Sequence, residues 1–573
     1  MSRKFGVALV VAAVPSALGA GEVGRLGQIS TPYGPAFLKV EGDNLYVSTF
    51  YNSNLQWKNA PDAVYRYPIT SSAFPGSFDV RASTTAAKVT WPNEVSETSG
   101  PAFVNATSGL AVRATSVPGG FIVPFKKSQL YVALDVGVAG KLATFQVSSS
   151  GGWFGSNKYF YHRALWKDID GDGDLDLLTA RSDYSVPPLG SFTGQLLWLE
   201  NPGAGGRGVA VGADVKALAA KNANGDVSSL LKPWTERVID DGADRSAGDT
   251  NFLVADLDGD GLEEIVATHF WPNGGGAKLP NLVVYSLKAG TVGGWGKATL
   301  KGGQVERTFV ETGFGGAFDV ELVDLDGDGR KEILTSNHNK VGQDAVVVAF
   351  EVPLAYKTAP WKNHTLARGF VNRVKDGMSP GAVQSFYPSA EAKAAGKRPW
   401  LVVSGDGAGA AYVMRPLNET SGSWGYELLN AYDTASDDAA GAAKTTGGIA
   451  LGTSPTGCAR IYVPVYEAGS TVVLDGCAME ANLDAMRRQT LKPAKFEVDD
   501  AAVPSDDRAA VASGSSAPLV GGVAAACVVL VLGAALIVAK RRAAAAHAPT
   551  AEARLDVLEH GKGTLSTRNP LHQ

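Results

Sequence analysis

The chain has 573 residues, with 52 basic and 57 acidic side chains and a formal net charge of −5 at pH 7. It is rich in glycine (68) and contains only three cysteines. This length exceeds one ordinary core and suggests an array of units. The charge balance offers no basic stripe, so we expect no nucleic-acid partner.

The N-terminus has the features of a secretory signal peptide over residues 1–20. Arg3 and Lys4 precede an apolar run at residues 5–14, and small residues at 17–20 provide a cleavage site. The chain is therefore expected to enter the secretory pathway.

The next segments consist of short runs of β-branched and aromatic residues separated by turns, which is typical of strands. Two units of this kind precede residue 168. The expected strands are residues 36–40, 45–50 and 63–67 in the first unit, and 120–123, 129–134 and 142–147 in the second.

One acidic loop then occurs three times, beginning at Asp168, Asp256 and Asp324. Each copy has carboxylates at loop positions 1, 3, 5 and 9 and glycine at position 6, so like charges converge. A bound divalent cation makes this tolerable. A flexible loop offering about six oxygen ligands suits Ca²⁺ better than the strictly octahedral Mg²⁺.

The EF-hand shares the opening of this pattern but needs an acidic residue at position 12 and flanking helices. Position 12 is Thr179, Ala267 or Thr335 here. The segments after the loops are short and aliphatic, so each loop is expected to join two neighbouring strands.

With such flanking strands, the pattern D-x-D-x-D-G-x-x-D resembles the FG-GAP, or VCBS-type, calcium-loop repeats that form the integrin α-subunit β-propeller. The resemblance implies about three Ca²⁺ ions, held by side chains at positions 1, 3, 5 and 9 and by the backbone carbonyl at position 7. The implied ligands are Asp168, Asp170, Asp172, Asp174 and Asp176; Asp256, Asp258, Asp260, Leu262 and Glu264; and Asp324, Asp326, Asp328, Arg330 and Glu332. The family's Phe-Gly pair appears once, at Phe314 and Gly315, and its Gly-Ala-Pro after the loop is absent.

A period of about 65 residues organises the chain. The loop onsets are 88 and 68 residues apart, and four tryptophans spaced by 61, 66 and 63 residues are each expected to open the last strand of a unit: Trp234, Trp295, Trp361 and Trp424. Two further units without acidic loops follow, around residues 384–404 and 448–465. Seven units predict an all-β fold, a closed seven-bladed β-propeller over residues 21–491, with the ions as structural cross-links in blades three to five.

Two cysteines flank a predicted hairpin. Pairing Val465 with Ser470 also places Cys458 opposite Cys477, at a distance that a disulfide bridges, and an oxidising compartment favours the bond. Three sequons for N-glycosylation lie at Asn105, Asn363 and Asn418.

The C-terminal part predicts a single membrane span. Residues 492–518 have the composition of a flexible stalk, and residues 519–539 form an uncharged stretch long enough to cross a bilayer. Lys540, Arg541 and Arg542 follow at once, which places the tail, residues 540–573, in the cytosol. A buried core helix or the removable tail of a lipid anchor are the alternatives, and the polar tail argues against the latter.

These features favour a type I membrane protein at the cell surface or in an endomembrane compartment, whose propeller binds an unknown protein or glycan. We expect no integrin-type heterodimer, because no room remains for further domains. The alternatives are a sugar-processing, lyase-like enzyme using His162, His269 or His338, and a structural scaffold of a wall or matrix.

Overall fold

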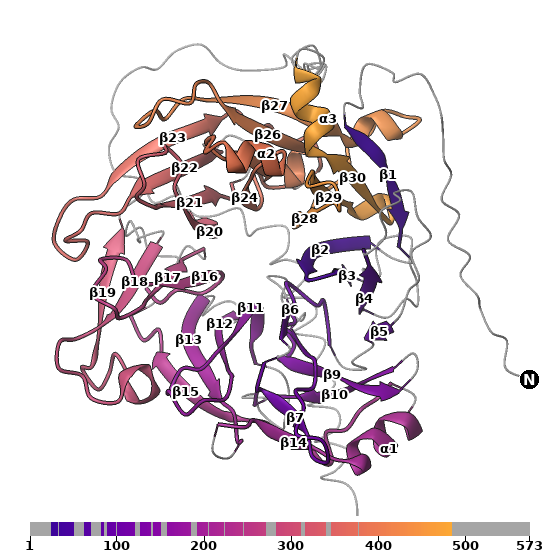
Figure 1. Cartoon of the computed structure of the whole chain (residues 1–573), viewed down its shortest axis with the longest axis vertical. Helices are drawn as coiled ribbons and strands as arrows, with labels where there is room; N and C mark the ends of the chain where they lie inside the picture. Colours follow the sequence, from indigo (N-terminus) through magenta and orange to yellow (C-terminus); the bar gives the residue numbers. More distant parts are fainter. Residues whose placement is uncertain are drawn as a thin grey trace, which may run out of the picture. The chain divides into compact units, whose positions relative to one another are not determined.

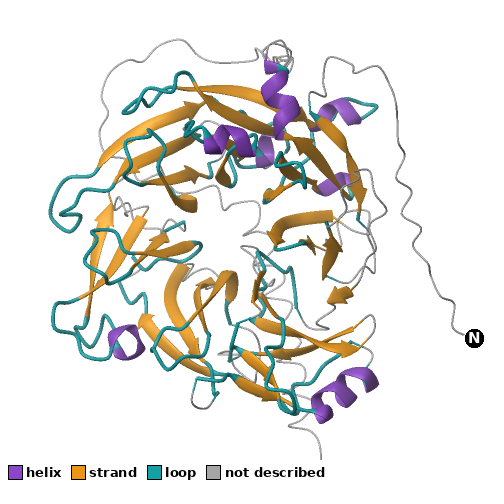
Figure 2. Ribbon diagram, viewed as in Figure 1, coloured by secondary structure: helices purple, strands orange, loops and turns teal. Residues whose placement is uncertain are grey.

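Seven antiparallel four-stranded sheets make up the described part of the chain (Figures 1 and 2). The computed structural model describes residues 24–483, except residues 32–33, 51–61, 70–81, 85–88, 99, 121–126, 139–140, 150–157, 185–191, 204–205, 223, 245, 271–281, 311–315, 340–344 and 376. The described residues all lie in the compact unit Met1–Lys495. The expected all-β, seven-bladed propeller is confirmed.

Within the first six blades, strands pair with their neighbours along the chain, from the innermost first strand to the outermost fourth strand. Blades 1 to 3 comprise β2 (Gly34–Glu41), β3 (Asn44–Phe50), β4 (Ala63–Pro68) and β5 (Ala82–Thr84); β6 (Ser96–Thr98), β8 (Ala114–Val117), β9 (Tyr131–Val138) and β10 (Lys141–Gln146); and β11 (Phe160–Lys167), β12 (Asp176–Tyr184), β13 (Phe192–Glu200) and β15 (Thr235–Asp240). Blades 4 to 6 comprise β16 (Phe252–Ala255), β17 (Glu264–Thr268), β18 (Leu282–Leu287) and β19 (Val305–Val310); β20 (Ala317–Val323), β21 (Glu332–Asn337), β22 (Val346–Glu351) and β23 (Lys362–Arg368); and β24 (Val383–Phe386), β25 (Trp400–Ser404), β26 (Ala410–Pro416) and β27 (Tyr426–Asp433).

Blade 7 closes the ring with strands from both ends of the described chain. It comprises β28 (Ala450–Thr453), β29 (Ala459–Val465), β30 (Ser470–Asp475) and, as its outermost strand, β1 (Arg25–Ser30). β1 pairs antiparallel with β30 from Ser30 opposite Ser470 to Arg25 opposite Leu474. The N-terminal strand therefore completes the last blade.

Several short elements lie outside the seven four-stranded sheets. A parallel pair, β7 (Phe103–Asn105) with β14 (Val209–Val211), connects the insertions of blades 2 and 3. The helical segments are α1 (Ala213–Lys221), α2 (Ala390–Ala394), α3 (Gly476–Ala481), η2 (Gly294–Lys297), η3 (Asp406–Ala408), η4 (Thr434–Asp437) and η5 (Tyr466–Ala468). None of the helices in the described residues is long and apolar enough to cross a membrane.

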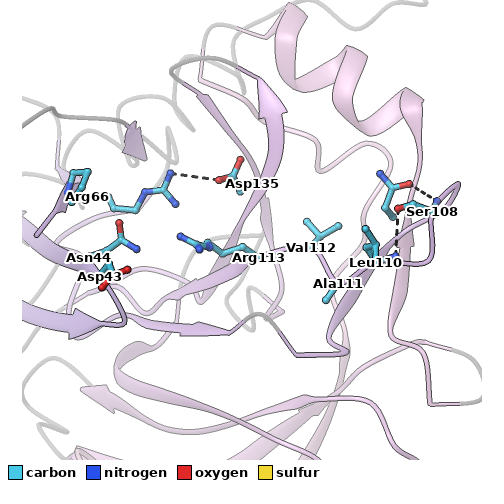
Figure 3. A pocket seen from close by; sticks show the side chains of 11 residues that line it. Asp43, Asn44, Arg66, Ser108, Leu110, Ala111, Val112, Arg113 and Asp135 are labelled. Atoms are coloured by element: carbon cyan, nitrogen blue, oxygen red, sulfur yellow. Dashed lines mark hydrogen bonds and ion pairs between the residues drawn. The ribbon is translucent and has the colours of Figure 1, made fainter. Parts of the chain in front are cut away.

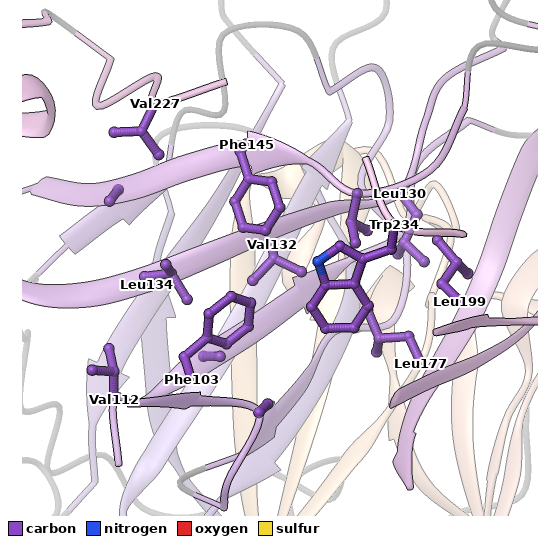
Figure 4. Packing of buried hydrophobic residues seen from close by; sticks show 14 of the residues in the cluster. Phe103, Val112, Leu130, Val132, Leu134, Phe145, Leu177, Leu199, Val227 and Trp234 are labelled. Atoms are coloured by element: carbon purple, nitrogen blue, oxygen red, sulfur yellow. The ribbon is translucent and has the colours of Figure 1, made fainter. Parts of the chain in front are cut away.

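The core consists of wedges between neighbouring sheets. The middle strands are buried on both faces, as in β17 and β25, where every residue is buried. Continuous aliphatic runs suit such strands because each sheet packs against two others. Figure 4 shows the wedge between blades 2 and 3, where the ring of Phe103 lies 6.0 Å from that of Phe145 and 5.7 Å from that of Trp234.

One strand prediction was wrong, and another lies mostly outside the described residues. Trp295 does not open a fourth strand: it lies in η2, where Gly293 and Gly294 have positive φ, and the fourth strand is β19. In blade 2 the first two described strands are β6 and β8. Of the strand predicted at residues 120–123 only Gly120 is described, bridging to Lys127, so that strand stays a prediction. The other three tryptophans directly precede or lie two residues before their fourth strands, as predicted.

Several predictions fall outside the described residues. These are the signal peptide (1–20), Phe314 and Gly315, the stalk (492–518), the membrane span (519–539) and the tail (540–573). They stay predictions.

Candidate metal centres and central channel

The three acidic loops join the first and second strands of blades 3, 4 and 5: loop 1 (168–176), loop 2 (256–264) and loop 3 (324–332). In each copy the residue before the loop pairs with loop position 9, as Lys167 does with Asp176. Position 9 thus begins the second strand. The prediction that each loop joins neighbouring strands, without helices, is confirmed.

One set of hydrogen bonds folds all three loops. The carboxylate at position 1 accepts the backbone N–H of position 4 at 2.7 Å and that of position 6 at 2.9 to 3.1 Å. The carboxylate at position 9 accepts the N–H of position 2 at 2.8 to 3.0 Å. The glycines at positions 4 and 6 have φ between +74° and +99°, which side chains disfavour. The repeated Asp-Gly-Asp-Gly pattern is therefore a geometric requirement of the loop.

In each loop, carboxylate oxygens of three acidic residues lie within 4.8 Å of one another. The three groups are Asp168, Asp170 and Asp176; Asp256, Asp258 and Asp260; and Asp324, Asp326 and Glu332. Asp172, Glu264 and Asp328 belong to the same loops but not to these groups. Converging carboxylates on a flexible loop fit a hard cation such as Ca²⁺. The role of the position-7 carbonyls of Asp174, Leu262 and Arg330 stays a prediction.

The acids at these sites are hard to keep ionised without a counter-ion. Burial, followed by the charges of neighbouring carboxylates, raises the pKa of Asp176 and of Glu332 to about 7. Backbone N–H donors offset part of this effect at both residues. A bound divalent cation would favour the ionised form.

Asp174 differs from its counterparts in the other loops because its side chain is buried (1% exposed). Neither carboxylate oxygen forms a hydrogen bond within the described residues, although the N–H of Gly208 lies near enough to lower its pKa. Burial and Asp172 still raise the pKa of Asp174 to about 6. A side chain at Gly203 would clash with Oδ2 of Asp174, so the glycine-rich segment closes over this carboxylate.

The predicted disulfide between Cys458 and Cys477 is confirmed, with Cα atoms 5.4 Å apart. Val465 faces Ser470, which is the register expected from the sequence. The side chains of the three sequon residues are exposed at Asn105, Asn363 and Asn418. Their glycosylation stays a prediction.

A cavity of about 490 Å³ lies at the centre of the propeller and is lined by residues of the first strand of every blade. Its lining mixes polar and apolar side chains, and a charged network crosses it. Glu94, just before β6, accepts hydrogen bonds from Lys39 at 3.2 Å and from Arg163 at 2.7 and 3.0 Å. Arg163 also donates to Asp319 at 3.1 Å and to the carbonyl of Phe252 at 3.3 Å. One guanidinium therefore connects blades 2, 3, 4 and 5.

The electrostatics of this network are strongly coupled. Burial alone would raise the pKa of Glu94, but Arg163 and Lys39 lower it to about 2. Burial raises the pKa of Asp319 despite Arg163, and raises that of Glu321, although both oxygens of Glu321 accept hydrogen bonds from Ser385. No sequence motif predicts that Arg163, Glu94 and Asp319 interact, because only the closure of the ring brings them together.

The three candidate histidines do not line this cavity. His269 and His338 each follow a second strand and place Nδ1 2.9 Å from a backbone carbonyl, of Ala247 and Pro380 respectively. Their equivalent placement on adjacent blades is as predicted. All three histidines are at most 8% exposed.

Aromatic rings surround two of these histidines. The rings of Phe37 and Phe318 lie 5.1 and 5.4 Å from that of His162, and Phe318 stacks on His338 at 4.9 Å. Burial lowers the pKa of His162 to about 3 and that of His338 to about 4. These neutral, packed rings are part of a buried aromatic cluster.

A further hollow of about 590 Å³ lies between β4 and the start of β3 in blade 1 and the residues 105–113 of blade 2 (Figure 3). Arg66 and Arg113 line it, and Arg66 contacts Asp135 at 3.5 Å. The sequon residue Asn105 and the exposed Leu110 also line it.

No protein-family model matches the sequence. No curated protein matches it either. Among solved structures, a putative 6-phosphogluconolactonase from Bacteroides fragilis is 12% identical, covers 69% of this chain and 87% of its own, and gives a TM-score of 0.33. The soluble aldose sugar dehydrogenase from Escherichia coli is 10% identical, with 67% and 99% covered and a TM-score of 0.32. Likenesses this low carry no argument about function.

Proposed function

We propose that the protein is a calcium-binding, FG-GAP-like β-propeller that recognises a protein or glycan outside the cytosol. The observation that carries the proposal is the threefold recurrence of one loop, with the same hydrogen bonds and the same convergence of carboxylates. Each ion would cross-link the first two strands of its blade. Affinities of ~10⁻⁴ to 10⁻³ M suffice outside the cytosol.

Calcium binding is tested by isothermal titration of the purified full chain and by its melting temperature with calcium or with chelator. We expect about three ions per chain and a lower melting temperature after chelation. The variant with Asp168→Asn, Asp256→Asn and Asp324→Asn is the control, and its melting temperature should not respond to calcium. Equal melting curves of the unmutated protein under both conditions would contradict the proposal.

We infer the compartment and topology from the sequence. The predicted signal peptide, the disulfide between Cys458 and Cys477 and the predicted span 519–539 together support a type I protein at the cell surface or in an endomembrane compartment. Protease protection in sealed microsomes tests this orientation. The propeller should be protected and the tail 540–573 should be cleaved.

Recognition is supported by the polar cavity to which every blade contributes. Its volume of about 490 Å³ falls in the range typical of small-ligand sites, which suits a terminal sugar or a single side chain of a partner. Glycan and protein arrays probed with the calcium-loaded chain test the proposal. Selective binding that Lys39→Met weakens is expected, whereas binding to neither array would favour a scaffold role.

A further inference from the structure

Each calcium loop is covered by a segment of the next blade, the connection between that blade's third and fourth strands. Residues 288–304 of blade 4 include η2, and we call them cover 1. Residues 352–361 of blade 5 are cover 2, and residues 417–425 of blade 6 are cover 3. All three covers lie wholly within the described residues.

Cover 1 packs directly against loop 1. A Cβ atom on Gly296 would lie 2.5 Å from the Cβ atom of Asp170, so only glycine fits there. Ile169 of the loop and Trp295 of the cover belong to the same buried cluster. Any movement of Asp170 is therefore transmitted to η2.

Cover 2 places a buried hydroxyl at loop 2. Tyr356 is 1% exposed, and its side chain interacts electrostatically with the ligand residue Glu264. Its hydroxyl lies next to the carboxylate of Glu264 and the side chain of Ser286. Leu257 of the loop packs against the cluster that contains Tyr356. Cover 2 therefore contacts loop 2 through the hydroxyl of Tyr356 and through the packing of Leu257.

Cover 3 holds loop 3 through backbone groups. The N–H of Gly422 donates to the carbonyl of Asp326 at 3.0 Å. Directly after the cover, the hydroxyl of Tyr426 donates to the carbonyl of Leu325 at 3.1 Å. Loop 3 is thus fixed by blade 6 as loop 1 is fixed by blade 4.

The covers also contact the loops of their own blades, which joins the sites in a row. Nε1 of Trp295 in cover 1 donates to the carbonyl of Glu263 in loop 2 at 3.0 Å. The guanidinium of Arg330 in loop 3 donates to the carbonyl of Val352 in cover 2 at 2.6 Å. Lys167, next to loop 1, pairs with Glu263 at 2.6 Å. The contacts run without a break from loop 1 through cover 1, loop 2 and cover 2 to loop 3.

We propose that Trp295 and Tyr356 are positioning residues that link the three cation sites, so that calcium at one site raises the affinity of the next. The inference rests on the proposed calcium function and deepens it. An ion that orders loop 1 also orders η2, and through Trp295 it orders loop 2 before the second ion binds. The second ion then loses less conformational freedom on binding, which is positive coupling. The propeller responds to calcium over a narrower concentration range than three independent sites would.

The test is calcium titration of the full chain by calorimetry, with site 1 removed by Asp168→Asn and Asp170→Asn. Linked sites predict that the remaining ions bind at least about 5-fold more weakly than the corresponding ions of the unmutated protein. Unchanged affinities at the remaining sites would overturn the proposal while leaving the calcium function intact. A chain that binds no calcium at all would overturn both.

Two milder variants test the links without removing a ligand. Trp295→Phe keeps the packing but removes the donor to Glu263, and Tyr356→Phe removes only the buried hydroxyl. Both should still bind about three ions, with a broader titration than the unmutated protein. The matched control is Tyr67→Phe, which removes a buried hydroxyl in blade 1, away from the loops. An equal effect of the control would refute the assigned roles.

Discussion

Replacing Arg163 by methionine tests whether the charged network across the central cavity stabilises the folded propeller. The substitution keeps much of the side chain's volume but leaves Glu94 and Asp319 without their shared cation. Their side chains are only 15% and 5% exposed, so water replaces the lost partner poorly. Removing one partner of a buried ion pair costs about 3–5 kcal/mol, because the other charge stays buried.

This loss converts into a measurable change of melting temperature. The unfolding entropy is about 2.1 cal/mol/K per residue, so the total unfolding entropy of a propeller of this size is roughly 1 kcal/mol/K. We therefore expect Tm to fall by about 3–5 °C in differential scanning calorimetry at pH 7 with saturating calcium.

The matched control is Arg237→Met, which breaks the pair with Glu200 on the surface. That pair is as short, at 2.6 Å, but its side chains are 51% and 32% exposed. Exposed pairs contribute about 0–1 kcal/mol, so Tm should change by less than about 1 °C. Adding Glu94→Gln to Arg163→Met should restore part of the loss, because it removes one of the two buried carboxylates that lose their shared cation. Equal effects of the Arg163 and Arg237 variants would refute the reasoning.

Three more predictions follow from other groups. The pKa of Glu94 is lowered to about 2 in the folded protein. The ionised carboxylate therefore contributes its full stabilisation above the unfolded pKa near 4.5, and this stabilisation is lost as the pH falls through 2. The Tm difference between the unmutated protein and Arg163→Met should shrink between pH 5 and pH 2. Replacing Cys458 and Cys477 by serine opens a loop with a separation of 19 residues, which should lower the unfolding free energy by about 3 kcal/mol in denaturant titrations; an unchanged midpoint would show that the bond is dispensable. Gly261→Ala places a side chain in open space but at φ +86°, so it should lower the unfolding free energy by about 1–2 kcal/mol through backbone strain alone; a neutral result would mean that the loop relaxes.

Local patterns predicted much of this architecture. The acidic loops, their flanking strands, the number of blades and the pairing of Cys458 with Cys477 all depend on residues close together in the chain. The strand predicted at Trp295 was wrong because the spacing of this residue matches that of the strand-opening tryptophans. Gly293 and Gly294 turn the chain there before a strand forms. The indole instead packs in the wedge between blades 3 and 4.

The charged network across the central cavity was not predicted, for a different reason. Arg163 meets Glu94 and Asp319 across 69 and 156 residues of sequence, and only the closed ring brings them together. The histidines show the converse. His269 and His338 lie at equivalent positions, as their spacing predicts, but spacing says nothing about how deeply either side chain is buried.

The strand β1 has a consequence for how the molecule matures. Its partner β30 ends at Asp475, so residues 25–30 emerge from the ribosome more than 400 residues before the strand they pair with. Until synthesis reaches that point, β1 has no partner strand, and the ring of blades is not closed. A stop codon upstream of β30 would leave β1 without its partner strand and the ring without its seventh blade.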